Sequence, residues 1–431
     1  MAPTSGFLRQ FCLTTLSTCC FFLCSASAST EIVLHNFLWQ PDGSEPIAAM
    51  VFDKSGNLFG TTFEGGSGDA GTIFEISPNG ASGWTYRIIY SFDCHPGCYP
   101  QGPLTIDEQG NLYGATQIGG ANNDGTIFQL SRQSDGNWSV RTLFVFGDVS
   151  NGGGFWPNGV VYHQGALFGL TFSGGEFEFG TAFALTPNGT DDWSETVLHS
   201  FSCNNGDGWG PVGGVALDEK GNVYGVTEGG GTGFDGTVFE LSRDIGGHWE
   251  ESILHNFSGP DGSSPWYGAA PILDEAGNLY GTTGYGGSGG YGTVFKLSRS
   301  GNTWTQTILH NFSGDLDGAL LYAGVTMDSR GQLYGTTLEG GGQGVCTELP
   351  PPQNLYCGTL FRLTPSHSGE WTETVLHRFG GLNDGAEPAA AVVLDPSDNI
   401  YGVASSGGTL PLRSGVVFRF GRTNRTLTTA D

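Results

Sequence analysis

The chain alternates short apolar runs with clusters of glycine, asparagine, aspartate and serine, and this alternation returns every 54 to 56 residues over most of its length. In one copy the apolar runs are "APILD" (270–274), "NLYGTT" (278–283), "GTVFKLS" (292–298) and "WTQTILHNF" (304–312). Each run is short and rich in Val, Ile, Thr and aromatic residues, which is typical of β-strands separated by turns. No window shows a sustained helical period flanked by caps. The pattern therefore predicts an all-β protein with four short strands in each copy.

Three markers occur seven times each and define the repeat. The second run carries an aromatic residue followed by glycine, with the aromatic residue at Phe59, Tyr113, Phe168, Tyr224, Tyr280, Tyr334 and Tyr401. The third run carries a phenylalanine at Phe74, Phe128, Phe183, Phe239, Phe295, Phe361 and Phe418. The fourth run ends in a phenylalanine at Phe37, Phe92, Phe146, Phe201, Phe257, Phe312 and Phe379. Four antiparallel strands repeated seven times predict a seven-bladed β-propeller, because radial closure leaves few exposed strand edges.

The two ends of the repeat region predict how the ring closes. The segment "EIVLHNF" (31–37) is a run of the fourth type with no unit before it, and "GVVFRF" (415–420) is a run of the third type with none after it. We therefore predict that the N-terminal strand completes the seventh blade. The expected propeller spans 29–421, with a polar tail at 422–431. Its blades are expected at 44–92, 99–146, 155–201, 209–257, 265–312, 319–379 and 386–420.

The repeat also resembles a known family. The motif "GNLYGTT…GG…GTVFxL" followed by "W…LHxF" is similar to the GloVer tandem repeat of exported bacterial proteins described as choice-of-anchor repeat proteins. The similarity covers 31–420. It implies a bacterial, exported, propeller-like protein and does not imply a reaction. Such proteins often carry a C-terminal sorting anchor, whereas this chain ends in the polar segment "GRTNRTLTTAD", which favours free secretion over surface attachment.

Residues 1–28 differ in composition from the rest of the chain. They hold one charge, Arg9, then the apolar stretch "FCLTTLSTCCFFLC", then Ala26, Ser27 and Ala28. This layout predicts a cleaved secretory signal peptide, because the apolar stretch is short for a membrane span of about 20 residues. We expect the mature protein to have no membrane span and to be secreted, periplasmic or on the cell surface.

Five cysteines lie outside the signal peptide, and export favours disulfides. Cys94 and Cys98 are close in sequence, and Cys346 and Cys357 flank the insertion "TELPPPQNLY" that lengthens the sixth copy. Both pairs are expected to form local disulfides, which leaves Cys203 without a predicted partner.

The charge and glycine content exclude two classes of ligand. The 42 acidic and 16 basic residues give a net charge of −26, which would repel nucleic acid. The stretch "GTTGYGGSGGYGTVF" (281–295) has the glycine spacing of a dinucleotide-binding loop, but a strand follows it where a phosphate site needs a helix N-terminus. The 74 glycines are better explained by turns that need positive φ angles.

Histidine and aspartate recur at fixed places in the repeat. Five of the fourth-type runs carry a histidine two residues before the phenylalanine: His35, His199, His255, His310 and His377. Tyr90 and Phe144 replace it in the other two, which favours a packing or hydrogen-bonding position over a metal ligand. An Asp-Gly turn follows at Asp42, Asp207, Asp261, Asp317 and Asp384. Asp315 and Asp317 are a weak calcium candidate, because the other ligands of a calcium loop are missing. Apart from calcium, no cofactor is expected.

Aromatic residues also gather where the chain enters the first strand of a blade: Tyr99, Trp156, Trp209, Trp266, Tyr267 and Tyr322. In a four-stranded meander this point lies on the same face as the loop between the second and third strands. Aromatic side chains there can stack on sugar rings, or they can fill gaps between blades. The sequence leaves both interpretations open.

The sequence carries no recognised catalytic signature. Glu64, Glu228 and Glu339 lie beside the glycine loops of three different blades, which does not make a catalytic pair. We therefore expect a non-catalytic recognition or scaffold protein, a monomer, that binds a glycan or a protein on its loop face. The alternative is an extracytoplasmic polysaccharide hydrolase, lyase or lactonase with carboxylates near the central channel.

Overall fold

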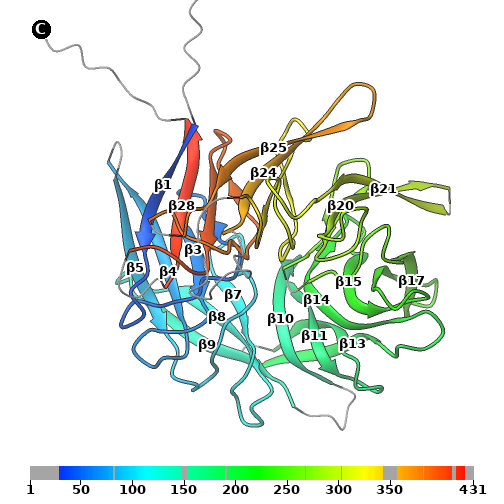
Figure 1. Ribbon diagram of the computed structural model, residues 1–431. Coiled ribbons are helices and arrows are strands. Elements are labelled where there is room, and N and C mark those ends of the chain that lie inside the picture. Colours follow the sequence, from blue (N-terminus) through cyan, green and yellow to red (C-terminus); the bar gives the residue numbers. More distant parts are fainter. Residues whose placement is uncertain are drawn as a thin grey trace, which may run out of the picture.

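The computed structural model describes residues 29–80, 83–147, 153–189, 192–266, 268–301, 303–342, 357–381, 383–409 and 414–422. These residues form seven four-stranded antiparallel sheets, and none of them is in a helix. Figure 1 shows the sheets arranged as the blades of a ring. The predicted seven-bladed β-propeller is confirmed.

Each of the first three blades consists of four strands that follow one another in sequence. Blade 1 contains β2 (Val51–Phe52), β3 (Leu58–Thr62), β4 (Thr72–Asn79) and β5 (Gly83–Ser91). Blade 2 contains β6 (Thr105–Ile106), β7 (Leu112–Thr116), β8 (Thr126–Arg132) and β9 (Trp138–Val145). Blade 3 contains β10 (Gly154–His163), β11 (Ala166–Gly174), β12 (Thr181–Asn188) and β13 (Asp192–Ser200).

The next three blades have the same order of strands. Blade 4 contains β14 (Gly208–Leu217), β15 (Val223–Gly230), β16 (Thr237–Arg243) and β17 (Trp249–Asn256). Blade 5 contains β18 (Ile272–Leu273), β19 (Leu279–Thr283), β20 (Thr293–Ser300) and β21 (Thr303–Asn311). Blade 6 contains β22 (Thr326–Met327), β23 (Leu333–Thr337), β24 (Thr359–Pro365) and β25 (Trp371–Arg378).

Blade 7 joins the two ends of the chain. It contains β26 (Val393–Leu394), β27 (Ile400–Ala404), β28 (Val416–Arg422) and, as its outer strand, β1 (Ser29–Asn36). The first and last strands pair antiparallel from Ser29 opposite Arg422 to Asn36 opposite Val416, and they lie side by side in Figure 1. The prediction that the N-terminal strand completes the seventh blade is confirmed.

The phenylalanine markers of the repeat pack between neighbouring blades. In every blade the phenylalanine after the outer strand contacts the third-strand phenylalanine of the next blade. Phe257 and Phe295, for example, have ring centroids 5.2 Å apart, and the seven equivalent pairs lie at 5.1 to 5.4 Å. The third-strand ring then covers the glycine of the aromatic-Gly marker on its own blade, so a single stack connects two blades.

This stack explains why glycine follows the aromatic residue. A Cβ added at Gly281 would lie 2.6 Å from the ring of Phe295, which is closer than real Cβ contacts come. We expect Gly281→Ala to lower the free energy of unfolding by about 1–3 kcal/mol through overpacking, measured by chemical denaturation. Gly214→Ala is the matched control, because the nearest atom to its Cβ would be 3.5 Å away. Equal losses in both variants would contradict this packing account.

The innermost strands differ from the sequence expectation. Five are only two residues long, whereas β10 and β14 each run for ten residues. In these two long strands the pairing register shifts, between Pro157 and Gly159 and between Val212 and Ala216. Such bulges let a strand bend and continue its pairing beyond the point where the other five stop.

Candidate functional site

The loops of the propeller gather on one face. The connection into the first strand of a blade lies against the connection between the second and third strands, as the bridges Ser44–Glu64 and Ser263–Tyr285 show. We call this end the loop face, and the end with the tight turns after the first and third strands the turn face. The predicted common face of the two connections is therefore present.

One residue in each blade has a left-handed backbone on the loop face, where the chain approaches the first strand. These rim residues, with φ between 49° and 60°, are Glu45, Tyr99, Trp156, Gly210, Ser264, Leu320 and Glu387. Each donates its backbone N–H to a carbonyl of the preceding blade over 2.8 to 3.1 Å. The conformation is costly for a residue other than glycine, and such strain is often retained at functional sites. The same backbone conformation thus carries six different residue types in the seven blades, with glutamate in blades 1 and 7.

Two of the predicted aromatic residues, Trp156 and Trp266, are partly exposed and pack against further aromatic rings. Trp156 is 39% exposed and packs edge-on against Phe155, with ring centroids 5.4 Å apart. Trp266 is half-buried and contacts Tyr285 at 4.9 Å and Tyr322 at 5.5 Å. We call Trp266, Tyr285 and Tyr322 the aromatic cluster. It joins the loop face of blade 5 to that of blade 6.

The other predicted aromatic residues do not join this cluster. Tyr99 is half-buried and packs against Phe63 at 5.2 Å, between blades 1 and 2. Trp209 covers Gly229, where an added Cβ would lie 2.2 Å from the indole ring. Both fit the gap-filling interpretation. Tyr267 lies outside the described residues.

The most exposed aromatic residues of the loop face are not among those predicted from the sequence. Five of them lie in the loops between the second and third strands of blades 3, 4 and 5. They are Phe177, Phe179, Phe234, Tyr285 and Tyr291, which are 44%, 41%, 70%, 42% and 45% exposed. In the sequence, each of these residues stands out as an aromatic residue inside a glycine-rich loop, at a position that is not one of the packing positions of the repeat. The aromatic side of the loop face therefore runs over blades 3 to 5.

Carboxylates occupy the other side of the loop face. Burial, together with Glu64 and Glu387, raises the pKa of Glu45. Burial and Glu387 likewise raise the pKa of Glu339. These four glutamates belong to blades 6, 7 and 1, and two of them, Glu45 and Glu387, are rim residues that the sequence analysis did not select. Glu228, by contrast, has its pKa raised by burial alone.

The central channel is narrow. The cavity in it has a volume of about 80 Å³, and its lining is mainly alanine, glycine and proline, with Gln101 and Tyr322 as polar groups. Small-molecule sites usually offer about 300–1,000 Å³. No carboxylate lines this cavity among the described residues. This channel cavity is therefore smaller than the usual small-molecule site.

A second cavity, of about 500 Å³, lies between blades 6 and 7 at the turn face. Its lining includes Arg330, Arg362 and Arg419, in a chain with only 16 basic residues. The Arg330 guanidinium donates to Asp328 at 2.9 Å and to Asp398 at 3.1 Å, which links the turns of the two blades. The turn face thus holds a cavity lined by three arginines, one of them paired with aspartates, whereas glutamates gather on one side of the loop face.

The recurring histidines and aspartates meet at the outer edge of the ring. The hydrogen-bonded pairs are His35–Asp42 (2.9 Å), His199–Asp207 (3.3 Å), His255–Asp261 (3.0 Å), His310–Asp317 (3.4 Å) and His377–Asp384 (3.1 Å). Each of these aspartates also accepts a backbone N–H in its own turn. The pairs therefore fasten the connection between two blades.

The calcium candidate lies in one of these turns. Asp317 is bonded to His310 and to the backbone N–H of Ser313, and Asp315 accepts the Gly341 N–H through its backbone carbonyl at 2.7 Å. Neither aspartate belongs to the one group of three metal-type ligands found among the described residues. Calcium binding at Asp315 and Asp317 stays a prediction.

A disulfide joins Cys94 and Cys98 beside blade 2, and Cys203 has a free thiol. Cys357 is buried and disulfide-bonded, while Cys346, the partner expected from the sequence, lies outside the described residues. Disulfides are consistent with an extracytoplasmic protein. In the part of the chain from Ser29 onward that the structure describes, no helix is long and apolar enough to span a membrane.

The fold and the seven markers define a tandem-repeat β-propeller. The sequence matches the Gloeobacter/Verrucomicrobia repeat over residues 17–206 and 190–354. The chain belongs to this family, as the motif comparison predicts. No curated protein shows a significant match to the sequence.

Solved structures share the fold at low sequence identity. The extracellular domain of BT4673 from B. thetaiotaomicron aligns with a TM-score of 0.55 and 13% identity over 92% of this chain, which spans 42% of that protein. A PL25 ulvan lyase aligns with a TM-score of 0.54 and 10% identity, covering 90% of this chain and 95% of the lyase. A Bacteroides uniformis protein assigned as a 6-phosphogluconolactonase gives 0.53 and 13%, covering 85% and 98%. At such identities these similarities establish the fold alone.

Proposed function

We propose that the protein is an exported, non-catalytic recognition module that binds a glycan on its loop face. The observation that carries this proposal is the aromatic cluster with its exposed neighbours. Trp266 is fixed between Tyr285 and Tyr322, and Tyr285 and Tyr291, in one loop of blade 5, are each more than 40% exposed. Fixed aromatic rings offer an apolar face with a polar edge at little cost in side-chain entropy, which suits the faces of sugar rings.

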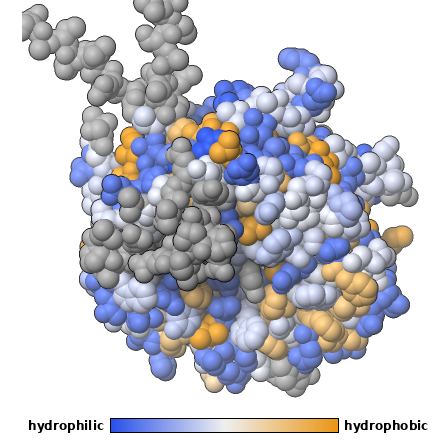
Figure 2. Space-filling model, viewed as in Figure 1, coloured by the Kyte–Doolittle hydropathy of each residue, from blue (hydrophilic) through white to orange (hydrophobic). Residues whose placement is uncertain are grey.

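The charge of the surface narrows the class of glycan. Glu45, Glu64, Glu339 and Glu387 lie on the same face as the aromatic residues, and the whole chain carries −26 charges. A polyanionic glycan would be repelled. Figure 2 shows small, separate apolar patches within a mostly hydrophilic surface, on the side that is visible. A neutral, hydroxyl-rich polysaccharide fits this surface best.

The same carboxylates support a second function. Burial and mutual repulsion raise the pKa of Glu45, as expected of a carboxyl group that can hold a proton for general acid catalysis. One structural neighbour is a polysaccharide lyase. The alternative is therefore an enzyme that cleaves polysaccharide at the acidic side of the loop face.

One assay separates the two functions. Residues 29–431 are incubated with a panel of soluble and insoluble polysaccharides, and both retention on the polymer and low-mass products are measured in the same tubes. We expect retention without products, weakened at least tenfold by Trp266→Ala or Tyr285→Ala, since truncation of an aromatic residue that dominates a binding surface costs about 2 kcal/mol or more. Ile245→Ala, on the turn face, removes a fully exposed apolar side chain away from the loop face and should leave retention unchanged.

Each outcome has a distinct meaning. Products that disappear in a Glu45→Gln variant would overturn the binding module in favour of the enzyme. The absence of both retention and products with every polysaccharide would contradict both proposals and leave a protein as the partner.

For export, we propose that the signal peptide is cleaved after Ala28. The mass of the protein recovered from the medium of expressing bacterial cells tests this cleavage.

A further inference from the structure

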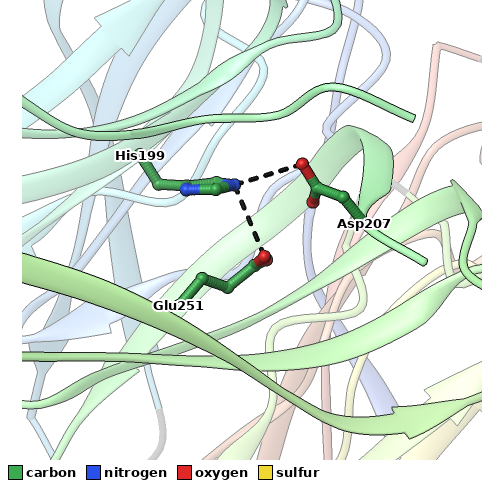
Figure 3. Close-up of side chains that lie close together, drawn as sticks. All are labelled: His199, Asp207 and Glu251. Atoms are coloured by element: carbon green, nitrogen blue, oxygen red, sulfur yellow. Dashed lines mark hydrogen bonds and ion pairs between the residues drawn. The ribbon is translucent and has the colours of Figure 1, made fainter. Parts of the chain in front are cut away.

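Three potential metal ligands converge where blades 3 and 4 meet, away from the loop-face aromatic residues. His199 comes from β13, Asp207 from the turn that leads to β14, and Glu251 from β17 of the next blade. His199 Nε2 lies 3.3 Å from Asp207 Oδ2 and 3.5 Å from Glu251 Oε2. Figure 3 shows all three side chains pointing toward a common point. Their ligand atoms all lie within 4.8 Å of one another.

Two of the three separations match those of a tetrahedral metal site. With metal–ligand distances of about 2.0–2.1 Å, two ligand atoms of a tetrahedral site lie about 3.3–3.4 Å apart. The two distances measured from His199 are close to that value before any ion has drawn the ligands in. The side chains of His199, Asp207 and Glu251 are only 23%, 11% and 12% exposed, so water screens the group poorly.

The charges of the group suit a bound cation. With Nε2 deprotonated, His199 and the two carboxylates would offer three acceptors and two negative charges around one point. Asp207 is partly satisfied by Ser202, but Glu251 Oε1 is buried without a hydrogen-bond partner. A divalent ion would balance both carboxylates.

We propose that His199, Asp207 and Glu251 bind a divalent first-row transition ion, Zn²⁺, that fastens blade 3 to blade 4. Imidazole together with carboxylate oxygens suits zinc, whereas calcium and magnesium prefer six or more oxygen ligands. Glu251 Oε1 or a water molecule would complete the tetrahedron. The zinc ion would stabilise the ring of blades, and this role does not depend on glycan binding.

The other blade interfaces lack this arrangement of three metal-type ligands among the described residues. The position of Glu251 is occupied by Gln306 beside His255 and Asp261, where the amide donates to the Asp261 carbonyl at 3.0 Å. It is occupied by Tyr86 beside His35, where the two rings stack at 3.6 Å. Glu373 holds the position beside His310 and Asp317. Even so, among the described residues only the group with Glu251 brings three ligand atoms within 4.8 Å.

The test uses residues 29–431 freed of metal with a chelator. Zn²⁺ is titrated by calorimetry, and Co²⁺ is added in parallel to detect a tetrahedral absorption spectrum. We expect one saturable site at micromolar Zn²⁺, a raised melting temperature, and at least a tenfold weakening in Glu251→Gln. Glu251→Gln should fold, because glutamine occurs naturally at this position in blade 5. Circular dichroism checks this.

Glu373→Gln is the matched control and should bind Zn²⁺ as tightly as the wild type. Three results would overturn the proposal. They are no saturable Zn²⁺ binding in the wild type, equal binding in Glu251→Gln, or displacement of bound Zn²⁺ by millimolar Ca²⁺.

Discussion

Removal of β1 by starting the chain at Leu38 is expected to abolish the single cooperative unfolding transition. The deletion exposes the edge of β28, which pairs with β1 along its length. It also removes Phe37, which is 1% exposed and packs 5.4 Å from Phe74 of blade 1. Loss of one such buried ring costs about 3–5 kcal/mol, and an open β-edge promotes aggregation.

Calorimetry and sedimentation of the truncated chain test this prediction. Addition of a synthetic peptide of residues 29–37 should restore part of the transition, because a strand can add to a free sheet edge. Phe312→Ala, an equivalent ring inside the chain, is the control for loss of packing without opening of the ring. A truncated chain that stays monomeric with an unchanged melting temperature would show that closure by β1 is not needed.

Glu195→Gln is expected to stabilise the protein at pH 8 and to have little effect at pH 5. Burial raises the pKa of Glu195 to about 7, and its Oε1 atom is buried without a hydrogen-bond partner. Because the folded protein holds the proton more tightly than the unfolded chain, this glutamate destabilises the fold progressively as pH rises from about 4.5 to about 7. The expected gain at pH 8 is about 1–3 kcal/mol, allowing for partial exposure.

Urea denaturation at both pH values measures this difference. Glu250→Gln, at an exposed position of β17, is the control and should change the free energy of unfolding by no more than about 0.5 kcal/mol at either pH. A Glu195→Gln variant with the same loss of stability between pH 5 and pH 8 as the wild type would contradict the assignment.

The fold was predictable because each repeat carries the same packing residues. The positions of Phe295 and Gly281 recur at fixed spacing in every blade, because the phenylalanine ring occupies the space that a Cβ on the glycine would need. The sequence did not reveal that Phe257, from the preceding blade, completes that stack. Contacts between repeats depend on how neighbouring blades are placed, and a periodic sequence pattern does not contain that information.

The candidate site was only partly predictable for the same reason. Trp266 and Tyr322 were selected by their place in the repeat, whereas Tyr285 was passed over as part of a glycine turn. Glu251 lies in an outer strand whose sequence resembles the six other outer strands. Its contact with His199 of the previous blade is visible only in the structure. Sequence spacing therefore locates positions on a face, while the packing of blades decides which of them meet.

The loop face as a glycan-binding surface is tested most directly by hydrogen–deuterium exchange of residues 29–431 with and without fragments of a polysaccharide from the panel. Binding is predicted to slow exchange in the loops 174–180, 230–236 and 284–292, which carry the exposed aromatic residues of blades 3 to 5. The turns of the opposite face, such as 53–57 and 274–278, should exchange as before. Protection confined to the turn face, or no protection with any glycan of the panel, would contradict the proposed function.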